Sequence, residues 1–118
     1  LSAEYNIHHG LANALLIKFG LEFTISKAMK SENQSLLSKL EKIGDIISSN
    51  TIVDISYIPD ILNTYINNIG ISLGLGEYGV LEENIPHLAN LALEDSCHAT
   101  HPFPVTMEDF TAVYTRAL

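Results

Sequence analysis

The chain has 118 residues, of which 47% are hydrophobic and 17% charged, and this balance excludes a disordered protein because enough apolar surface is available to form a core. We expect one domain covering residues 1–118. Six basic and fourteen acidic residues give a net charge of −8, and no run of Lys or Arg could neutralise a phosphate backbone, so nucleic acid is excluded as a partner.

The first amphipathic segment covers residues 10–27. Its apolar residues recur on one face of a 3.6-residue helix, at Leu11, Ala14, Leu15, Phe19 and Phe23. The most apolar part is interrupted by Asn13, Lys18 and Glu22, so it is too short and too polar to span a bilayer. We expect a helix here and no membrane segment. The chain opens on Leu1 and shows no secretory signal, as expected for a fragment or a processed chain.

Four further helices are predicted by the same periodicity. The second has its apolar stripe at Leu36, Leu40, Ile43 and Ile47 and ends near residues 48–50. The third has its stripe at Ile58, Ile61, Leu62, Tyr65, Ile66 and Ile69, with Pro59 in the first turn and Gly70 after the end. The fourth has Pro86 near its start and its apolar positions at Ile85, Leu88, Ala89 and Ala92. The fifth has its inner face at Phe110, Val113, Tyr114 and Ala117.

Two local patterns complete the prediction of an all-α fold. Thr106 stands three residues before Asp109, which is the spacing of a capping box at the start of the fifth helix. The strand-like run at residues 51–55 is short and has no obvious partner strand, so we expect an extended connector there.

A glycine pattern at residues 74–79 matches G-x-G-x-x-G, which can cradle a dinucleotide phosphate. That function requires a strand before the motif and a helix opening from it. Here a helix precedes it and no long helix follows at once, so a glycine-rich turn between the third and fourth helices is favoured.

Two histidine-containing segments could bind a metal. Residues 97–101 hold Cys97, His98 and His101, but a closed zinc site needs about four ligands and no second cluster stands at a suitable spacing, which favours a solvated loop. His8 and His9 lie just before the first helix, and because adjacent residues point in different directions, at most one is expected to be a ligand. The single cysteine, Cys97, cannot form an internal disulfide and is consistent with a reducing compartment, so the cytoplasm is expected.

The segment from Tyr5 to Ala14, YNIHHGLANA, resembles the H-G-x-A-N-A segment of iron-containing alcohol dehydrogenases, a group with a dehydroquinate-synthase-like fold. The resemblance continues at residues 69–71, 77–80, 95–97, 100–104 and 114–118, and so covers nearly the whole chain. It implies a helical bundle equivalent to the C-terminal domain of these enzymes, with the nucleotide-binding α/β domain lying upstream of this chain.

The resemblance implies a role for two residues. His9 occupies the position of the family's last metal ligand, with His8 its neighbour and not a ligand. Cys97 resembles a residue that lines the cavity beside the nicotinamide, although a packing role is an open alternative. The family's T-N-P-R becomes Thr100-His101-Pro102-Phe103 here, so this loop lacks the Asn and the Arg of the family pattern.

The resemblance also implies a whole-protein activity. Similar enzymes hold a divalent metal with one Asp and three His, three of which would lie upstream of His9. The full subunit would interconvert a small alcohol and its aldehyde or ketone with NAD or NADP, using Fe²⁺ or alternatively Zn²⁺ as a Lewis acid. The chain alone is expected to be inactive and to self-associate, and the protein to be a homo-oligomer. Alternatives are a non-catalytic helical interaction domain, or a related carbonyl reductase such as a maleylacetate reductase or hydroxyacid–oxoacid transhydrogenase.

Overall fold

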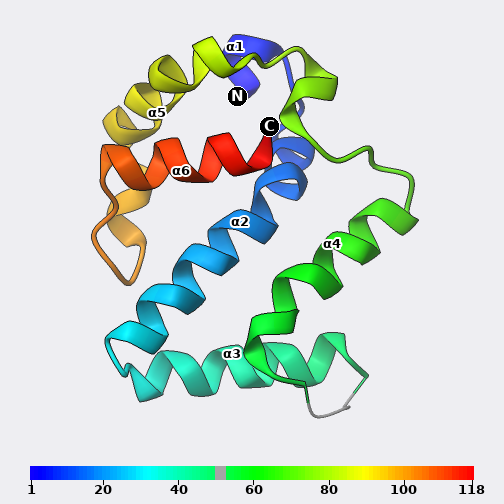
Figure 1. Cartoon of the computed structure of the whole chain (residues 1–118), viewed down its shortest axis with the longest axis vertical. Coiled ribbons are helices and arrows are strands. Elements are labelled where there is room, and N and C mark those ends of the chain that lie inside the picture. The colour runs from blue at the N-terminus through cyan, green and yellow to red at the C-terminus, as the bar shows by residue number, and fades with distance from the viewer. Residues whose placement is uncertain (50–52) are drawn as a thin grey trace. The chain divides into compact units, whose positions relative to one another are not determined.

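The computed structural model describes residues 1–49 and 53–118, and the regular elements in this part of the chain are helices (Figure 1). The α-helices are α1 (Ser2–Tyr5), α2 (His9–Lys30), α3 (Gln34–Ile47), α4 (Ile58–Asn68), α5 (Ile85–Glu94) and α6 (Met107–Ala117). Short 3₁₀ helices are η1 (Ile55–Tyr57), η2 (Leu75–Tyr78), η3 (Glu82–Asn84) and η4 (Ser96–Thr100). The expected all-α fold is confirmed.

The chain divides into two compact units, the first formed by Leu1–Leu16 with Ser72–Leu118. Within this unit α5 and α6 make the most extensive helix–helix contact. Its core is a set of side chains that are almost fully buried: Leu75, Val80, Ile85, Leu88, Ala89, Tyr114 and Ala117. Burial of each large apolar side chain contributes about 1.5–3 kcal/mol, so this core holds α5 and α6 together.

The second unit is Ile17–Ile71 and contains the rest of α2 with α3 and α4. Its core includes Ile25, Ala28, Leu40, Ile58 and Ile66. Gly44 of α3 lies against the start of α4, where an added Cβ would make an ordinary van der Waals contact with the Ile58 side chain at 3.4 Å.

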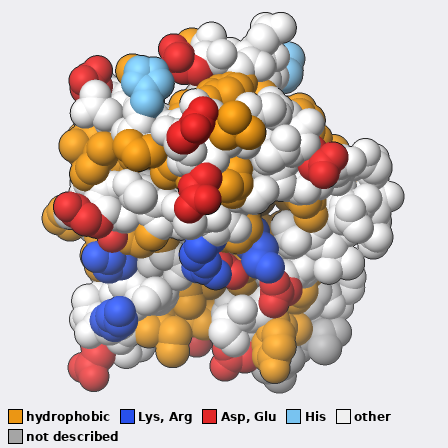
Figure 2. Space-filling view, turned by 45° about the horizontal axis from the view of Figure 1, so that its top comes forward, with side chains coloured by type: hydrophobic (Ala, Val, Ile, Leu, Met, Phe, Trp, Pro, Cys, Tyr) orange, Lys and Arg blue, Asp and Glu red, His pale blue; other side chains and the backbone are white. Residues whose placement is uncertain are grey.

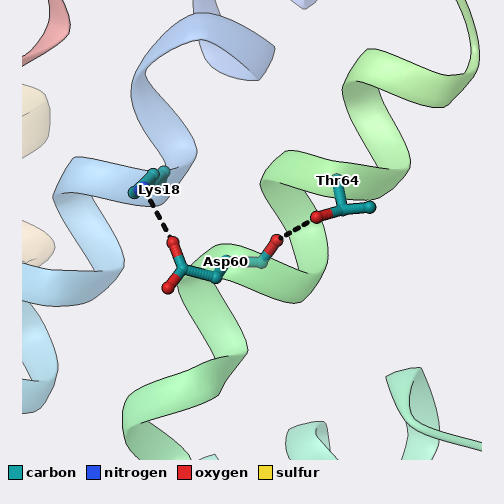
Figure 3. A network of polar contacts seen from close by, with 3 residues as sticks. All are labelled: Lys18, Asp60 and Thr64. Carbon is teal, nitrogen blue, oxygen red and sulfur yellow. Dashed lines mark hydrogen bonds and ion pairs between the residues drawn. The ribbon is translucent and has the colours of Figure 1, made fainter.

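A polar contact joins α2 to α4 within the second unit (Figure 3). Lys18 Nζ lies 2.7 Å from Asp60 Oδ1, and the Asp60 carbonyl accepts a hydrogen bond from Thr64 Oγ1 at 2.9 Å. The Lys18 side chain is only 23% exposed, so its stem is packed while its ammonium group reaches Asp60.

The five predicted helices are confirmed, with ends that differ from the expected ones by a few residues. The first helix extends at both ends, from His9 to Lys30. The expected signals at two other helices act as predicted: Pro59 lies in the first turn of α4, and Thr106 and Asp109 form a reciprocal capping box at α6. α1 and the four 3₁₀ helices were not predicted, because segments of three to five residues are too short to show a periodicity.

The extended connector expected at residues 51–55 needs a partial correction. Thr51 and Ile52 lie outside the described residues, but Ile55 begins the 3₁₀ helix η1. The Asp54 carboxylate accepts a hydrogen bond from Ser56 N at 2.8 Å and caps this turn. Local side-chain capping therefore overrides the β propensity of the run.

The glycine pattern forms a turn, as expected. Gly74 has φ +106 and Gly79 has φ +84, on either side of η2. The carbonyl of Leu118, beyond α6, accepts a long hydrogen bond from Gly76 N at 3.5 Å, and a Cβ added at Gly74 would meet that carbonyl at 3.3 Å. Gly74 therefore allows the end of α6 to approach the turn.

The surface carries both acidic and apolar side chains. Figure 2 shows orange apolar side chains lying between red carboxylates on one face. Ile46 is 76% exposed and Tyr65 is 62% exposed. Across residues 1–49 and 53–118, no helix has the length and hydrophobicity needed to cross a bilayer.

Candidate functional site

The two adjacent histidines at the start of α2 have different surroundings. The backbone carbonyl oxygen of His8 accepts a hydrogen bond from Ala12 N at 2.9 Å. Nδ1 of the His8 ring accepts another from Gly10 N at 3.3 Å, so His8 caps the helix. A neutral ring that accepts at Nδ1 carries its hydrogen at Nε2, which leaves no nitrogen lone pair for a metal. His9 is the first residue of α2 and is exposed, and no hydrogen bond or ion pair joins its ring to the described residues. His9 is therefore the better placed of the two to bind a metal.

Cys97 lies in the η4 turn that follows α5. The Asp95 carboxylate caps this turn by accepting from Cys97 N at 2.9 Å, and Thr100 Oγ1 donates to the Cys97 carbonyl at 2.8 Å. Hydrogen bonding to Asp95, and then the negative charge of that carboxylate, raise the pKa of the exposed Cys97 thiol. The thiol is therefore neutral near pH 7 and is a poor nucleophile and a poor metal ligand.

His9 and Cys97 line the same cavity in the first unit. The cavity has a volume of about 650 Å³ and is bounded by α1, the start of α2, α5, η4 and α6. Its apolar lining includes Leu88, Leu91 and Phe110. This volume lies within the range of about 300–1,000 Å³ that is usual for sites binding small molecules.

Tyr114 gives the cavity a further polar atom. Its side chain lines the cavity but is buried, and desolvation raises the pKa of the Tyr114 hydroxyl. This hydroxyl stays protonated at neutral pH, so it can donate a hydrogen bond but carries no charge.

The described side chains do not form a metal site by themselves. Among residues 1–49 and 53–118, no three His, Cys, Asp or Glu side chains are grouped so that they could hold a metal ion. The possible zinc cluster at residues 97–101 does not form: His98 Nε2 is 3.0 Å from the Leu93 carbonyl, and His101 Nδ1 accepts from Phe103 N at 3.1 Å. The exposed His9 imidazole could fill one metal-ligand position, and further ligands would have to come from outside the described residues.

The cavity also contains three residues whose place in it the sequence did not predict. His98, Phe110 and Tyr114 were expected to lie in a loop or on the inner face of a helix, and all three line the cavity. The His98 and Phe110 rings meet edge to face, with centroids 5.9 Å apart and planes at 81°. Only the folding of η4 against α6 brings them together, so no spacing in the sequence could reveal the contact.

Comparison with known proteins gives a family match over the whole chain. Residues 1–118 match the Fe-containing alcohol dehydrogenase family, C-terminal. Lactaldehyde reductase of Escherichia coli is 32% identical over 99% of this chain and 30% of its own length. NAD-dependent methanol dehydrogenase of Bacillus methanolicus is 30% identical over 97% of the chain and 29% of its own length.

A solved structure shows the same fold. The crystal structure of a 1,3-propanediol oxidoreductase superposes with a TM-score of 0.72 at 24% identity, over all of this chain and 30% of that protein. The chain thus spans about three tenths of the length of the relatives named above.

Proposed function

We propose that this chain, which belongs to the Fe-containing alcohol dehydrogenase family, is the C-terminal helical part of an NAD(P)- and metal-dependent enzyme that interconverts a small alcohol and its aldehyde or ketone. The observation that carries the proposal is that His9 and Cys97, the two site residues expected from the resemblance, line one cavity. The names of the relatives support the substrate class, since they act on lactaldehyde and methanol.

In this proposal His9 is one ligand of the catalytic metal. Its imidazole is exposed at the start of α2, while the His8 ring is held by the Gly10 N–H. A divalent metal would supply Lewis acidity to the substrate oxygen. Because one imidazole cannot fix the coordination geometry, the remaining ligands must come from residues upstream.

The other cavity residues bind and orient the reactants. The apolar surfaces of Leu88, Leu91 and Phe110 exclude water from the reacting carbon and from the nicotinamide ring. Cys97 forms the wall for the nicotinamide. Because its thiol is protonated, it offers a neutral, polarisable surface and does not react with an aldehyde product.

The proposal also covers the metal and the assembly. Iron is favoured over zinc because the matching family is described as Fe-containing. NAD is supported by the relative from Bacillus methanolicus, which is named as NAD-dependent, with NADP as the alternative. Exposed apolar side chains such as Ile46 support a homo-oligomer, and the single cysteine supports a cytoplasmic protein.

The test replaces each histidine in turn in the complete protein. We expect His9→Ala to lose most of the bound metal and to lower kcat/KM for alcohol oxidation by more than about 100-fold, since even the partners of metal ligands contribute 10–100-fold. The matched control His8→Ala removes only a helix cap and should keep its metal, with a loss of about 1 kcal/mol in stability. Metal content by elemental mass spectrometry and initial rates measure both. Full metal occupancy in His9→Ala would contradict the assignment.

A further inference from the structure

His98 is held in a defined tautomer on the cavity wall. Its Nε2 lies 3.0 Å from the Leu93 carbonyl oxygen, which can only accept a hydrogen bond. The hydrogen of a neutral His98 ring is therefore on Nε2, and the lone pair is on Nδ1. The edge-to-face contact with Phe110 restrains the ring in this orientation. The structure thus places a nitrogen lone pair on a residue that lines the same cavity as His9.

The remaining titratable side chains of the cavity are poorer proton acceptors. Within the described residues they are Glu4, His9, Asp95, Cys97 and Tyr114. The Cys97 thiol and the Tyr114 hydroxyl are already protonated, because their pKa values are raised. Hydrogen bonds from Cys97 lower the pKa of Asp95, and a carboxylate with a lowered pKa is a weak base.

The Glu4 carboxylate has another partner, and the His9 imidazole has another proposed role. The Glu4 carboxylate lies 3.3 Å from His87 Nε2 in an exposed pair. His9 is assigned to the metal by the proposed function. His98 is the remaining titratable group of the cavity lining, and its Nδ1 lone pair can accept a proton.

We propose that His98 accepts the hydroxyl proton of the alcohol as it is oxidised, an inference that rests on the proposed function. The substrate C–H bond breaks and hydrogen leaves with its electron pair as hydride to the nicotinamide of NAD⁺. The O–H bond breaks, its electrons form the C=O bond, and the proton bonds to His98 Nδ1. The imidazolium then releases this proton to water, since His98 is only partly buried. In the reverse direction the imidazolium protonates the product oxygen.

The test uses a variant that keeps the hydrogen bond to Leu93 and removes the base. In His98→Gln of the complete protein, the amide nitrogen can still donate to the Leu93 carbonyl, but no nitrogen can take a proton. We expect kcat for alcohol oxidation to fall about 100-fold at pH 7, the lower end of the effect of general base catalysis, while KM changes little. The pH profile of kcat should also differ between wild type and variant, which a purely structural role of His98 would not cause.

A neighbouring histidine provides the matched control. His101 does not line the cavity, and its Nδ1 lies 3.0 Å from the Phe103 carbonyl oxygen and 3.1 Å from Phe103 N, contacts that an Asn side chain can also make. His101→Asn should therefore keep the wild-type rate and pH profile. A second readout, independent of turnover, is ¹⁵N NMR of labelled histidine, in which the neutral form of the His98 ring should be protonated at Nε2 and bare at Nδ1.

The possible outcomes separate this inference from the function on which it rests. An active wild type with an unchanged rate and pH profile in His98→Gln would overturn the role of His98 and leave the proposed function standing. A neutral His98 protonated at Nδ1 in the NMR spectrum would overturn it as well. A metal-loaded wild type that oxidises no alcohol with NAD or NADP would contradict the proposed function, and the role of His98 would fall with it.

Discussion

Gly74→Ala should destabilise the first unit because two independent features of that position disfavour a side chain. The backbone there has φ +106, which costs an L-residue about 1–3 kcal/mol. The added Cβ would also lie 3.3 Å from the Leu118 carbonyl, closer than an ordinary van der Waals contact. We expect a loss of about 2 kcal/mol in the free energy of unfolding, which lowers Tm by roughly 5–10 °C for a chain of this size.

Gly20→Ala is the matched control for this effect. Gly20 lies inside α2, has no positive φ, and has nothing within 4 Å of an added Cβ. Alanine there should stabilise the helix by about 0.5–1 kcal/mol. Urea unfolding of the 118-residue chain, followed by circular dichroism, measures both variants. The same substitutions in the complete protein should leave the KM for NAD unchanged, because the glycine turn serves packing and not nucleotide binding. A Gly74→Ala variant as stable as wild type, or with a KM for NAD raised tenfold, would refute this reasoning.

Three further predictions concern the α6 cap, the Asp95 cap and the chain by itself. Thr106→Ala removes the hydroxyl that accepts from Asp109 N at 3.2 Å, and should cost about 1 kcal/mol in urea unfolding. In the folded chain the pKa of Asp95 is lowered by hydrogen bonds from Cys97. The ionised Asp95 therefore stabilises the fold fully above the ordinary Asp pKa of about 3.9, and this stabilisation is lost as the pH falls through the lowered pKa of the folded state. The Tm difference between wild type and Asp95→Asn should therefore shrink between pH 5 and pH 2, and a constant difference would contradict this role. The purified 118-residue chain should show no alcohol oxidation with NAD and an added divalent metal, because His9 alone cannot form the site; turnover well above background would contradict this.

Much of the fold could be predicted from the sequence, because its signals are local. Pro59 and the Thr106–Asp109 pair mark helix starts through backbone geometry and capping, which depend on residues a few positions apart. Leu88 and Ala89 belong to the apolar stripe that the helical period predicts for α5, and both side chains are buried in the core. The η1 turn at Ile55 was missed because the β-branched residues before it favour extended backbone, whereas a single Asp54 hydrogen bond favours the turn.

The site was predictable only in part. The roles of His9 and Cys97 were predicted from a resemblance to a family and not from their spacing. The two residues are far apart in the sequence, and only the tertiary fold brings both to the lining of one cavity. The contact of His98 with Leu93 and Phe110 depends on how η4 turns back from the end of α5. Nothing in the local sequence specifies which histidine of residues 97–101 faces the cavity.

Cys97 carries the single thiol of this chain, and chemical labelling of this thiol can probe the cavity. Cys97 is exposed and lines the wall, and Asp95 keeps its sulfur protonated, so a maleimide or fluorinated alkyl reagent should label it slowly. In the proposed function, a bound nucleotide would cover the sulfur and slow the labelling further. The labelling half-time, or the ¹⁹F shift of an attached probe, would then report occupancy of the cavity without any turnover.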